Sequence, residues 1–244
     1  AGLTVNRVGS MFTVFFTDGP VRLAPSVYEG KVYFGSDDGC AYCLNATDGA
    51  LVWKREPAQA DRRIPGNGRV ISVHPVRTGV LVSDGAAYFC AGLFPEEDVY
   101  ICAVDARAGK EIGKTVPDPQ AFMKEFTRGK RTARQFALSP QGYLLASESR
   151  LYLPTGRTSP AIVDRKTGEV LGLFNCGVGD GGTYALLAKG TLTSGPGVQL
   201  TAFNADTQEK VAAFPGRCLL VTDALSYLLS DNAVSSLDRA VFDK

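Results

Sequence analysis

The sequence shows almost no helical periodicity, because its apolar residues rarely recur at intervals of three and four, and this argues against a helix-rich fold. Its longest apolar runs, such as residues 219–221, are far too short to cross a bilayer. The N-terminal residues show no charged region followed by an apolar one, so no signal peptide is expected there. With a net charge of +1, the chain has no overall charge that would favour nucleic acid or an anionic membrane.

Histidine is also scarce. His74 is the only one, so a site built from several histidines is excluded and only a mechanism with a single histidine remains. His74 ends a β-prone run, which predicts a hydrogen-bonded side chain at the end of a strand.

The six cysteines are even in number, but the chain is too large for a fold held mainly by disulfides. Cys40 and Cys43 form a C-x-x-C pattern in a predicted strand, where they would point to opposite faces as buried thiols.

What the sequence does contain is a repeat. Residues 21–54 form four short β-prone runs separated by turn signals, among them Asp38-Gly39, which suits a tight hairpin. The unit ends on a turn from Asn45 to Gly49 and a last strand over residues 50–54. Four antiparallel strands in about 40 residues correspond to one blade of a β-propeller.

The strand–turn core of this unit recurs along the chain. The residues that open the recurring turn are Asn45, Asp105, Asp164, Asn204 and Asp238. Their spacings of 60, 59, 40 and 34 residues predict about five units, with insertions of about 20 residues in the two longer intervals. An Asn or Asp at this position caps its own turn, and a later Gly supplies positive φ. The sequence therefore predicts an all-β fold, a β-propeller of about five four-stranded blades, either a closed ring or a piece of a larger propeller. A β-sandwich is the structural alternative.

The units resemble the repeats of the pyrroloquinoline-quinone (PQQ) type propellers over residues 19–240, on the residues just given. That family repeats a turn of the form A-x-D-x-x-T-G with a Trp four residues after the Gly, and Gly49 followed by Trp53 fits it. The resemblance implies a propeller that is either a quinoprotein dehydrogenase or a scaffold without cofactor, in a periplasmic or other extracytoplasmic location. It also implies PQQ and calcium as the cofactors of an enzymatic member.

The later units depart from the family pattern at the Trp position, where Gly113, Gly172 and Ala212 stand. The adjacent cysteine pair that quinoprotein dehydrogenases hold against their cofactor is missing, and so is an obvious Glu, Asn and Asp set for calcium. The resemblance therefore favours the fold over the enzyme, and no cofactor is expected.

Residues 3–21 resemble a segment of the glutamate-1-semialdehyde aminomutases, which have an unrelated fold. This resemblance suggests a hybrid or fused gene, with residues 1–18 as a foreign segment and 19–244 as the propeller. The β-prone run at residues 11–16 could then supply the fourth strand of the fifth unit and close the ring.

Two groups of basic residues are candidates for binding. The first would contact a small anionic ligand in a funnel formed by loops at one end of the blades: Arg22, Arg69, Arg77 and Arg157. The second lies in an insertion with interleaved aromatic residues and would dock an acidic partner or a phosphate backbone: Lys124, Arg128, Lys130, Arg131 and Arg134. The alternatives are salt bridges for the first group and a solvated insertion for the second.

A Gly-rich run at residues 177–182 is interpreted as a loop between blades, because no helix or Lys-Ser/Thr follows it to make a phosphate cradle.

The sequence thus favours a non-enzymatic propeller that presents loops to a protein partner or a neighbouring domain, with no membrane or metal role and nucleic acid disfavoured. Open blade edges would also allow a homo-oligomer. The alternative is a PQQ-linked or other oxidoreductase domain that binds a small anionic ligand.

Overall fold

The computed structural model describes residues 4–8, 11–15, 25–58, 62–66, 68–128, 131–136, 138–156, 158–174, 182, 184–195 and 197–238. Within them the regular structure is antiparallel β-sheet with two short 3-10 helices, η1 (Pro95–Glu97) and η2 (Pro119–Phe122). The chain divides into two compact units, Ala1–Val116 and Pro117–Lys244. The predicted all-β fold is confirmed, and the sheets below are the blades of a β-propeller.

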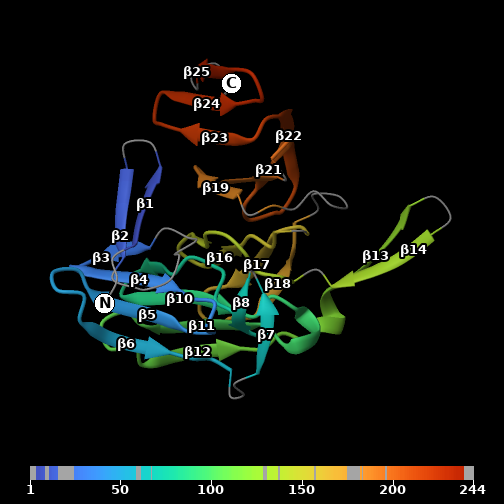
Figure 1. Ribbon diagram of the computed structural model, residues 1–244. Helices are drawn as coiled ribbons and strands as arrows, with labels where there is room; N and C mark the ends of the chain where they lie inside the picture. The colour runs from blue at the N-terminus through green and yellow to red at the C-terminus, as the bar shows by residue number, and fades with distance from the viewer. Residues whose placement is uncertain are drawn as a thin grey trace. The chain divides into compact units, whose positions relative to one another are not determined.

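The first unit contains two four-stranded blades, whose strands follow the chain in order. The first blade consists of β3 (Ser26–Tyr28), β4 (Lys31–Gly35), β5 (Ala41–Asn45) and β6 (Leu51–Arg55). The second consists of β9 (Leu81–Ser83), β10 (Ala86–Ala91), β11 (Tyr100–Asp105) and β12 (Glu111–Thr115). Figure 1 shows the two blades stacked against each other, and β3 contacts β9. Neighbouring blades thus meet through their first strands, as propeller blades do around a common axis.

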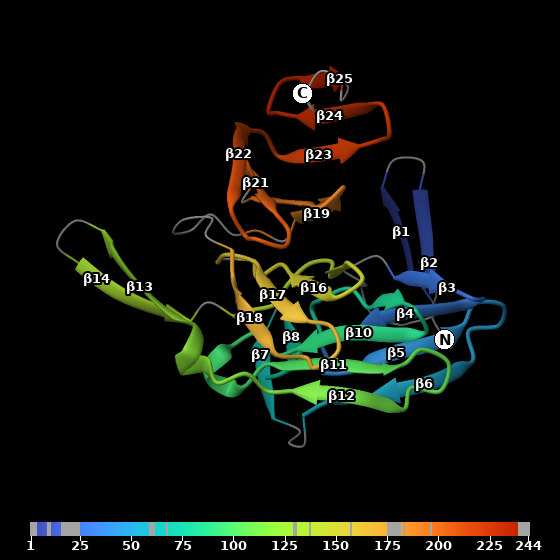
Figure 2. The same ribbon diagram turned by 180° about the vertical axis from the view of Figure 1, so that it is seen from behind.

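The second unit contains two more blades of four strands and one of three. The third blade consists of β15 (Leu145–Ala146), β16 (Arg150–Leu153), β17 (Ala161–Asp164) and β18 (Val170–Leu173). The fourth consists of β19 (Tyr184–Ala188), β20 (Thr191–Gly195), β21 (Gln199–Asn204) and β22 (Lys210–Pro215). The fifth consists of β23 (Cys218–Val221), β24 (Leu225–Leu229) and β25 (Val234–Asp238). First strands again lie together, β15 with β19 and β19 with β23, and Figure 2 shows the second of these pairs from behind.

The fifth blade differs from the prediction of four strands. Among the described residues it has three, and every residue of its third strand, β25, is exposed. In the fourth blade the corresponding strand, β21, has its four central residues buried. The core of the fold therefore lies in the four complete blades, and β25 is an open edge.

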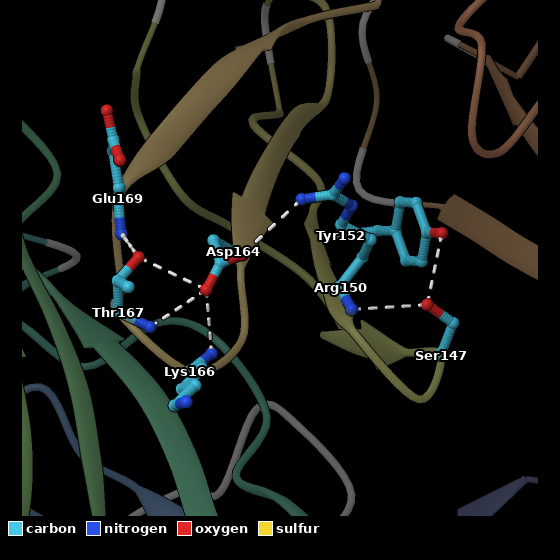
Figure 3. A network of polar contacts seen from close by, with 7 residues as sticks. All are labelled: Ser147, Arg150, Tyr152, Asp164, Lys166, Thr167 and Glu169. Carbon is cyan, nitrogen blue, oxygen red and sulfur yellow. Dashed lines mark hydrogen bonds and ion pairs between the residues drawn. The ribbon is translucent and has the colours of Figure 1, made fainter.

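In all four complete blades the side chain that opens the predicted turn accepts a hydrogen bond from the backbone N–H two residues later. At Asp164 the side-chain Oδ1 accepts from the backbone N of Lys166 at 3.0 Å and of Thr167 at 2.8 Å, and the Thr167 hydroxyl donates to it at 3.1 Å. Figure 3 shows this network together with Arg150, whose guanidinium lies 3.5 Å from the other carboxylate oxygen. Asn45, Asp105 and Asn204 accept backbone N–H donors in the same way. The cap that the sequence predicts is therefore present in each complete blade.

A β-bulge follows each of these turns at the same place. The register between the third and fourth strands shifts between Cys43 and Leu44 in the first blade, and at the matching residues of the other three. The extra residue on the fourth strand is a large apolar one, partly or mainly exposed in every case: Val52, Ile112, Leu171 and Val211. Bulges increase the local twist of an edge strand, which hinders edge-to-edge pairing.

Trp53 joins the first blade to the second. Its indole Nε1 donates to the carbonyl oxygen of Ala106 at 2.9 Å, and the Tyr33 hydroxyl donates to the same oxygen at 3.1 Å. A Cβ on Gly109 would lie 2.5 Å from Cγ of Trp53, so the ring packs directly on the turn of the next blade. These residues belong to a buried cluster shared by the two blades. The second unit has its own cluster, formed around Tyr152, Phe174 and Phe203.

Three further hairpins lie outside the blades: β1 (Thr4–Val8) with β2 (Met11–Phe15), β7 (Arg63–Gly66) with β8 (Arg69–Ser72), and β13 (Met123–Arg128) with β14 (Arg131–Phe136). The last two occupy the two predicted insertions. In the first of these hairpins β2 pairs with β1, and the ring-closing role of residues 11–16 stays a prediction. Only two residues separate these strands in the sequence, so their pairing costs little loop-closure entropy. The proposed boundary at residues 18 and 19 stays a prediction.

Candidate functional site

Three loops converge at one end of the two blades of the first unit. They are the β4–β5 turn, the segment that carries the β7–β8 hairpin, and the β10–β11 loop. The backbone N of Ser72 donates to the Asp37 carbonyl at 2.8 Å, that of Val76 to Ser36 at 2.9 Å, and that of Gly92 to Pro75 at 3.1 Å. The hairpin segment is therefore fastened by its main chain to the loops on both sides. We refer to these three segments together as the loop face.

Asp37 holds the charged side of the loop face together. One carboxylate oxygen lies 2.7 Å from Nη2 of Arg69, and the other lies 3.0 Å from Nε of Arg77. The Asp37 side chain is only 12% exposed. Burial opposes its ionisation, but the hydrogen bonds and positive charges of the two arginines outweigh burial, and the pKa of Asp37 is lowered. One carboxylate thus serves two guanidinium groups, which leaves a local excess of one positive charge.

His74 ties the hairpin segment to the β10–β11 loop. Its ring is buried, Nε2 donates to the carbonyl oxygen of Glu97, and the ring meets Tyr100 edge-on at 5.3 Å between centroids. Since a carbonyl can only accept, the proton is on Nε2, and Nδ1 has no partner among the described residues. The expectation of a hydrogen-bonded side chain at the end of a strand-like run is confirmed.

Glu97 contributes through its side chain as well. Its carboxylate forms an ion pair with Arg62, with Nη2 and Oε1 3.2 Å apart, and the hydrogen bond from Arg62 lowers the pKa of Glu97. Arg62 precedes β7, so this pair fastens the hairpin segment to the second blade at its outer rim. Both side chains are largely solvated, and such a pair adds little stability by itself.

Two of the loop-face segments also expose apolar side chains. Val70 on β8 is 67% exposed and Phe94 in the β10–β11 loop is 39% exposed. Exposed apolar residues on loops held in place by hydrogen bonds are typical of surfaces that bind other proteins.

The cysteines of the described chain have no disulfide partner. Cys40 and Cys43 are both buried, and burial raises the pKa of the Cys40 thiol to about 11. Burial likewise raises the pKa of Cys102 to about 12. Thiols with such raised pKa values stay protonated near neutral pH. The prediction that Cys40 and Cys43 are buried apolar thiols is confirmed.

Of the four arginines predicted to contact a ligand, Arg69 and Arg77 are brought together on Asp37, while Arg22 and Arg157 lie outside the described residues. The Gly-rich run is outside them too, except for Gly182. In the second basic group, Lys124 and Arg128 are on β13 and Arg131 and Arg134 on β14, and Lys130 is not described. The sequence did not single out Asp37 or Glu97, although Asp37 directly precedes the predicted Asp38-Gly39 turn.

Across the described ranges, no three or more His, Cys, Asp or Glu side chains gather where they could hold a metal. No helix among the same residues is long and apolar enough to cross a membrane.

No protein-family model matches this chain, and no curated protein matches it. Solved structures do match, and they show that the fold is that of a β-propeller. Among them is "BamB from Moraxella catarrhalis", 16% identical, with a TM-score of 0.62 over 92% of this chain and 62% of that one. Another is the quinohemoprotein alcohol dehydrogenase from Comamonas testosteroni, 16% identical, with a TM-score of 0.58 over 88% of this chain and 41% of that one.

A europium-containing methanol dehydrogenase is also similar, at 13% identity and a TM-score of 0.55 over 91% of this chain and 48% of that one. The chain therefore spans less than two thirds of the length of each of these proteins. At such identities the likeness shows the fold alone. The resemblance of residues 3–21 to glutamate-1-semialdehyde aminomutases finds no support in the comparisons.

Proposed function

We propose that this chain is a non-enzymatic β-propeller domain that binds another protein through its loop face. The observation that carries the proposal is that Val70 and Phe94 are exposed on loops that hydrogen bonds and ion pairs fasten to one another. Asp37 is engaged by two arginines, and His74 donates to a backbone carbonyl. A surface ordered in advance loses less conformational entropy on binding, which favours recognition.

Site-specific photo-crosslinking tests the proposal. A photoreactive residue at position 70 or 94 should form one discrete adduct in cells that make the protein. The control is position 112 on the outer strand β12, where Ile112 is similarly exposed at 62%. A partner bound at the loop face gives adducts at 70 and 94 and none at 112. Equal labelling at all three positions, or none at any, would refute the proposal.

The alternative function is an oxidoreductase domain that binds a small anionic ligand. The excess positive charge of Arg69 and Arg77 around Asp37 favours this alternative, since a ligand carboxylate could share the two guanidinium groups. Titration with PQQ and calcium distinguishes the two functions. A saturable change in the quinone absorbance that Arg77→Ala abolishes would establish the alternative, and we expect no such change.

A further inference from the structure

The β13–β14 hairpin forms a sheet of its own. Its six residue pairs run from Met123 opposite Phe136 to Arg128 opposite Arg131, and neither strand pairs with any other strand of the described chain. Figures 1 and 2 show it extending away from β15–β18 in both views. Both long edges of the hairpin therefore present unpaired backbone groups, which can accept another strand.

The register divides the hairpin residues between two faces. Directly opposite residues share a face, and alternate residues along a strand do too. One face thus carries Lys124, Phe126 and Arg128 from β13, together with Arg131, Ala133 and Gln135 from β14. The other face has Glu125 opposite Arg134, with Met123, Thr127, Thr132 and Phe136. Three basic positions with no acidic one thus fall on the first face, which we call the basic face, while the second face pairs opposite charges.

β13 is the more distinctive strand for recognition. On the basic face it alternates basic, aromatic and basic residues at 124, 126 and 128, whereas β14 has one basic residue there. β14 also packs against η2, the short helix that leads into the hairpin. A strand added along β13 would therefore run beside two basic positions with an aromatic position between them.

We propose that the β13 edge binds an extended acidic segment of a protein partner, which adds to the hairpin as a third strand. Main-chain hydrogen bonds supply affinity in this mode, and alternate side chains supply specificity. The matching segment has acidic residues at its first and fifth positions and an apolar residue at its third, because every second residue of a strand lies on the same face. A protein segment suits this edge better than nucleic acid, because the net charge of the whole chain is only +1 and a phosphate backbone needs a more extended positive surface.

This inference rests on the proposed binding function but uses different residues, in the second unit. Its test uses the full chain and a fluorescent peptide with the repeated pattern Glu-Thr-Val-Thr, which places Glu and Val in turn on one face and is long enough to run along β13. The peptide should bind saturably and more weakly as salt rises. Arg128→Glu should weaken binding about tenfold, because it replaces an attraction by a repulsion. Arg134→Glu makes the same charge change on the other face and should weaken binding no more than about twofold.

Two further probes separate this binding mode from others. A peptide whose main-chain N–H groups are methylated should lose binding, and the same peptide with Lys in place of each Glu should bind Arg128→Glu better than the unchanged protein. Equal effects of Arg128→Glu and Arg134→Glu, full binding of the methylated peptide, or tighter binding of a single-stranded oligonucleotide would each overturn the proposal. Unchanged thermal melting of both variants verifies that folding is intact. A failure here leaves crosslinking at positions 70 and 94 unaffected, so the two proposals fail separately.

Discussion

Gln208 lies beside Gly172 where the third and fourth blades meet, and its Oε1 is 3.3 Å from the point that a Cβ on Gly172 would occupy. Gly172 holds the sequence position of Trp53, and Gln208 holds that of Gly109. Between the first two blades the strand supplies the large side chain and the turn supplies glycine. Between the third and fourth the arrangement is reversed: the turn supplies the side chain. Gln208 also has a φ of +64°, a conformation that a glycine adopts at less cost.

This reversal can be undone. Gln208→Gly should stabilise the protein by up to about 1 kcal/mol, because relief of the left-handed backbone outweighs the added flexibility of the unfolded chain. Gly172→Trp alone should be neutral or destabilising, since the ring must displace Gln208. The double variant should exceed the sum of the two by about 1 kcal/mol, with the indole donating to Ala205 as Trp53 does to Ala106. Urea denaturation of all four proteins measures this coupling, and additive effects would contradict it.

The contact between Trp53 and Gly109 has a matched control within the same blade. Gly85 and Gly109 both have positive φ, +75° and +65°, but a Cβ on Gly85 would meet nothing within 4 Å. Gly85→Ala should therefore cost about 1 kcal/mol through backbone strain alone. Gly109→Ala should cost a further 1–3 kcal/mol, roughly, because its Cβ would overlap the indole. Thermal melting should show that this excess disappears in a Trp53→Ala background; a persistent excess would mean that the indole is not its cause.

The sequence predicts the blades well, because the information that defines them is local. An Asn or Asp cap and a positive φ four residues later suffice to place each turn, and the strands on either side follow from it. The hairpins β7–β8 and β13–β14 were predicted only as insertions, because Pro65 and Gly66 within β7 are typical of loops. The role of Gln208 was not predicted either, since it depends on which residue faces it from the next blade.

The turn cap makes its own prediction at Asp164. Backbone and side-chain hydrogen bonds from Thr167 lower the pKa of Asp164, so the ionised carboxylate is the form that caps the turn. Asn stands at this position in the first and fourth blades, where its amide oxygen accepts the backbone N–H two residues later and, in the fourth blade, also the one three residues later. Asp164→Asn should therefore melt close to the unchanged protein, whereas Asp164→Ala should melt at a lower temperature. Equal melting of the two variants would show that the acceptor oxygen has no role.

The loop face was only partly predictable. Basic residues at 69 and 77 could be expected at one end of the blades, since both fall in the insertion that follows the first repeat, residues 21–54. Their common partner, Asp37, is more than 30 residues away in the chain, and no local pattern links it to them. His74 and the Glu97 carbonyl are likewise brought together only by folding, because they lie on two separate loops.

Asp37 should make the stability of the first unit depend on pH. Its folded-state pKa is below the ordinary value of 3.8, so its ionised form is stabilised in the folded state. The stability that it contributes is therefore complete above its unfolded pKa and is lost as pH falls through the lower, folded value. Asp37→Asn should cost about 1–3 kcal/mol at pH 7, because two arginines lose a charged acceptor. The deficit should shrink as pH falls below 3.8, where the carboxylate of the unchanged protein becomes protonated.

Glu29→Gln, which removes the exposed ion pair with Arg107, should cost less than about 1 kcal/mol at pH 7. Melting of the three proteins from pH 7 to pH 3 measures both effects, and a deficit for Asp37→Asn that stays constant with pH would contradict the role of the ionised carboxylate.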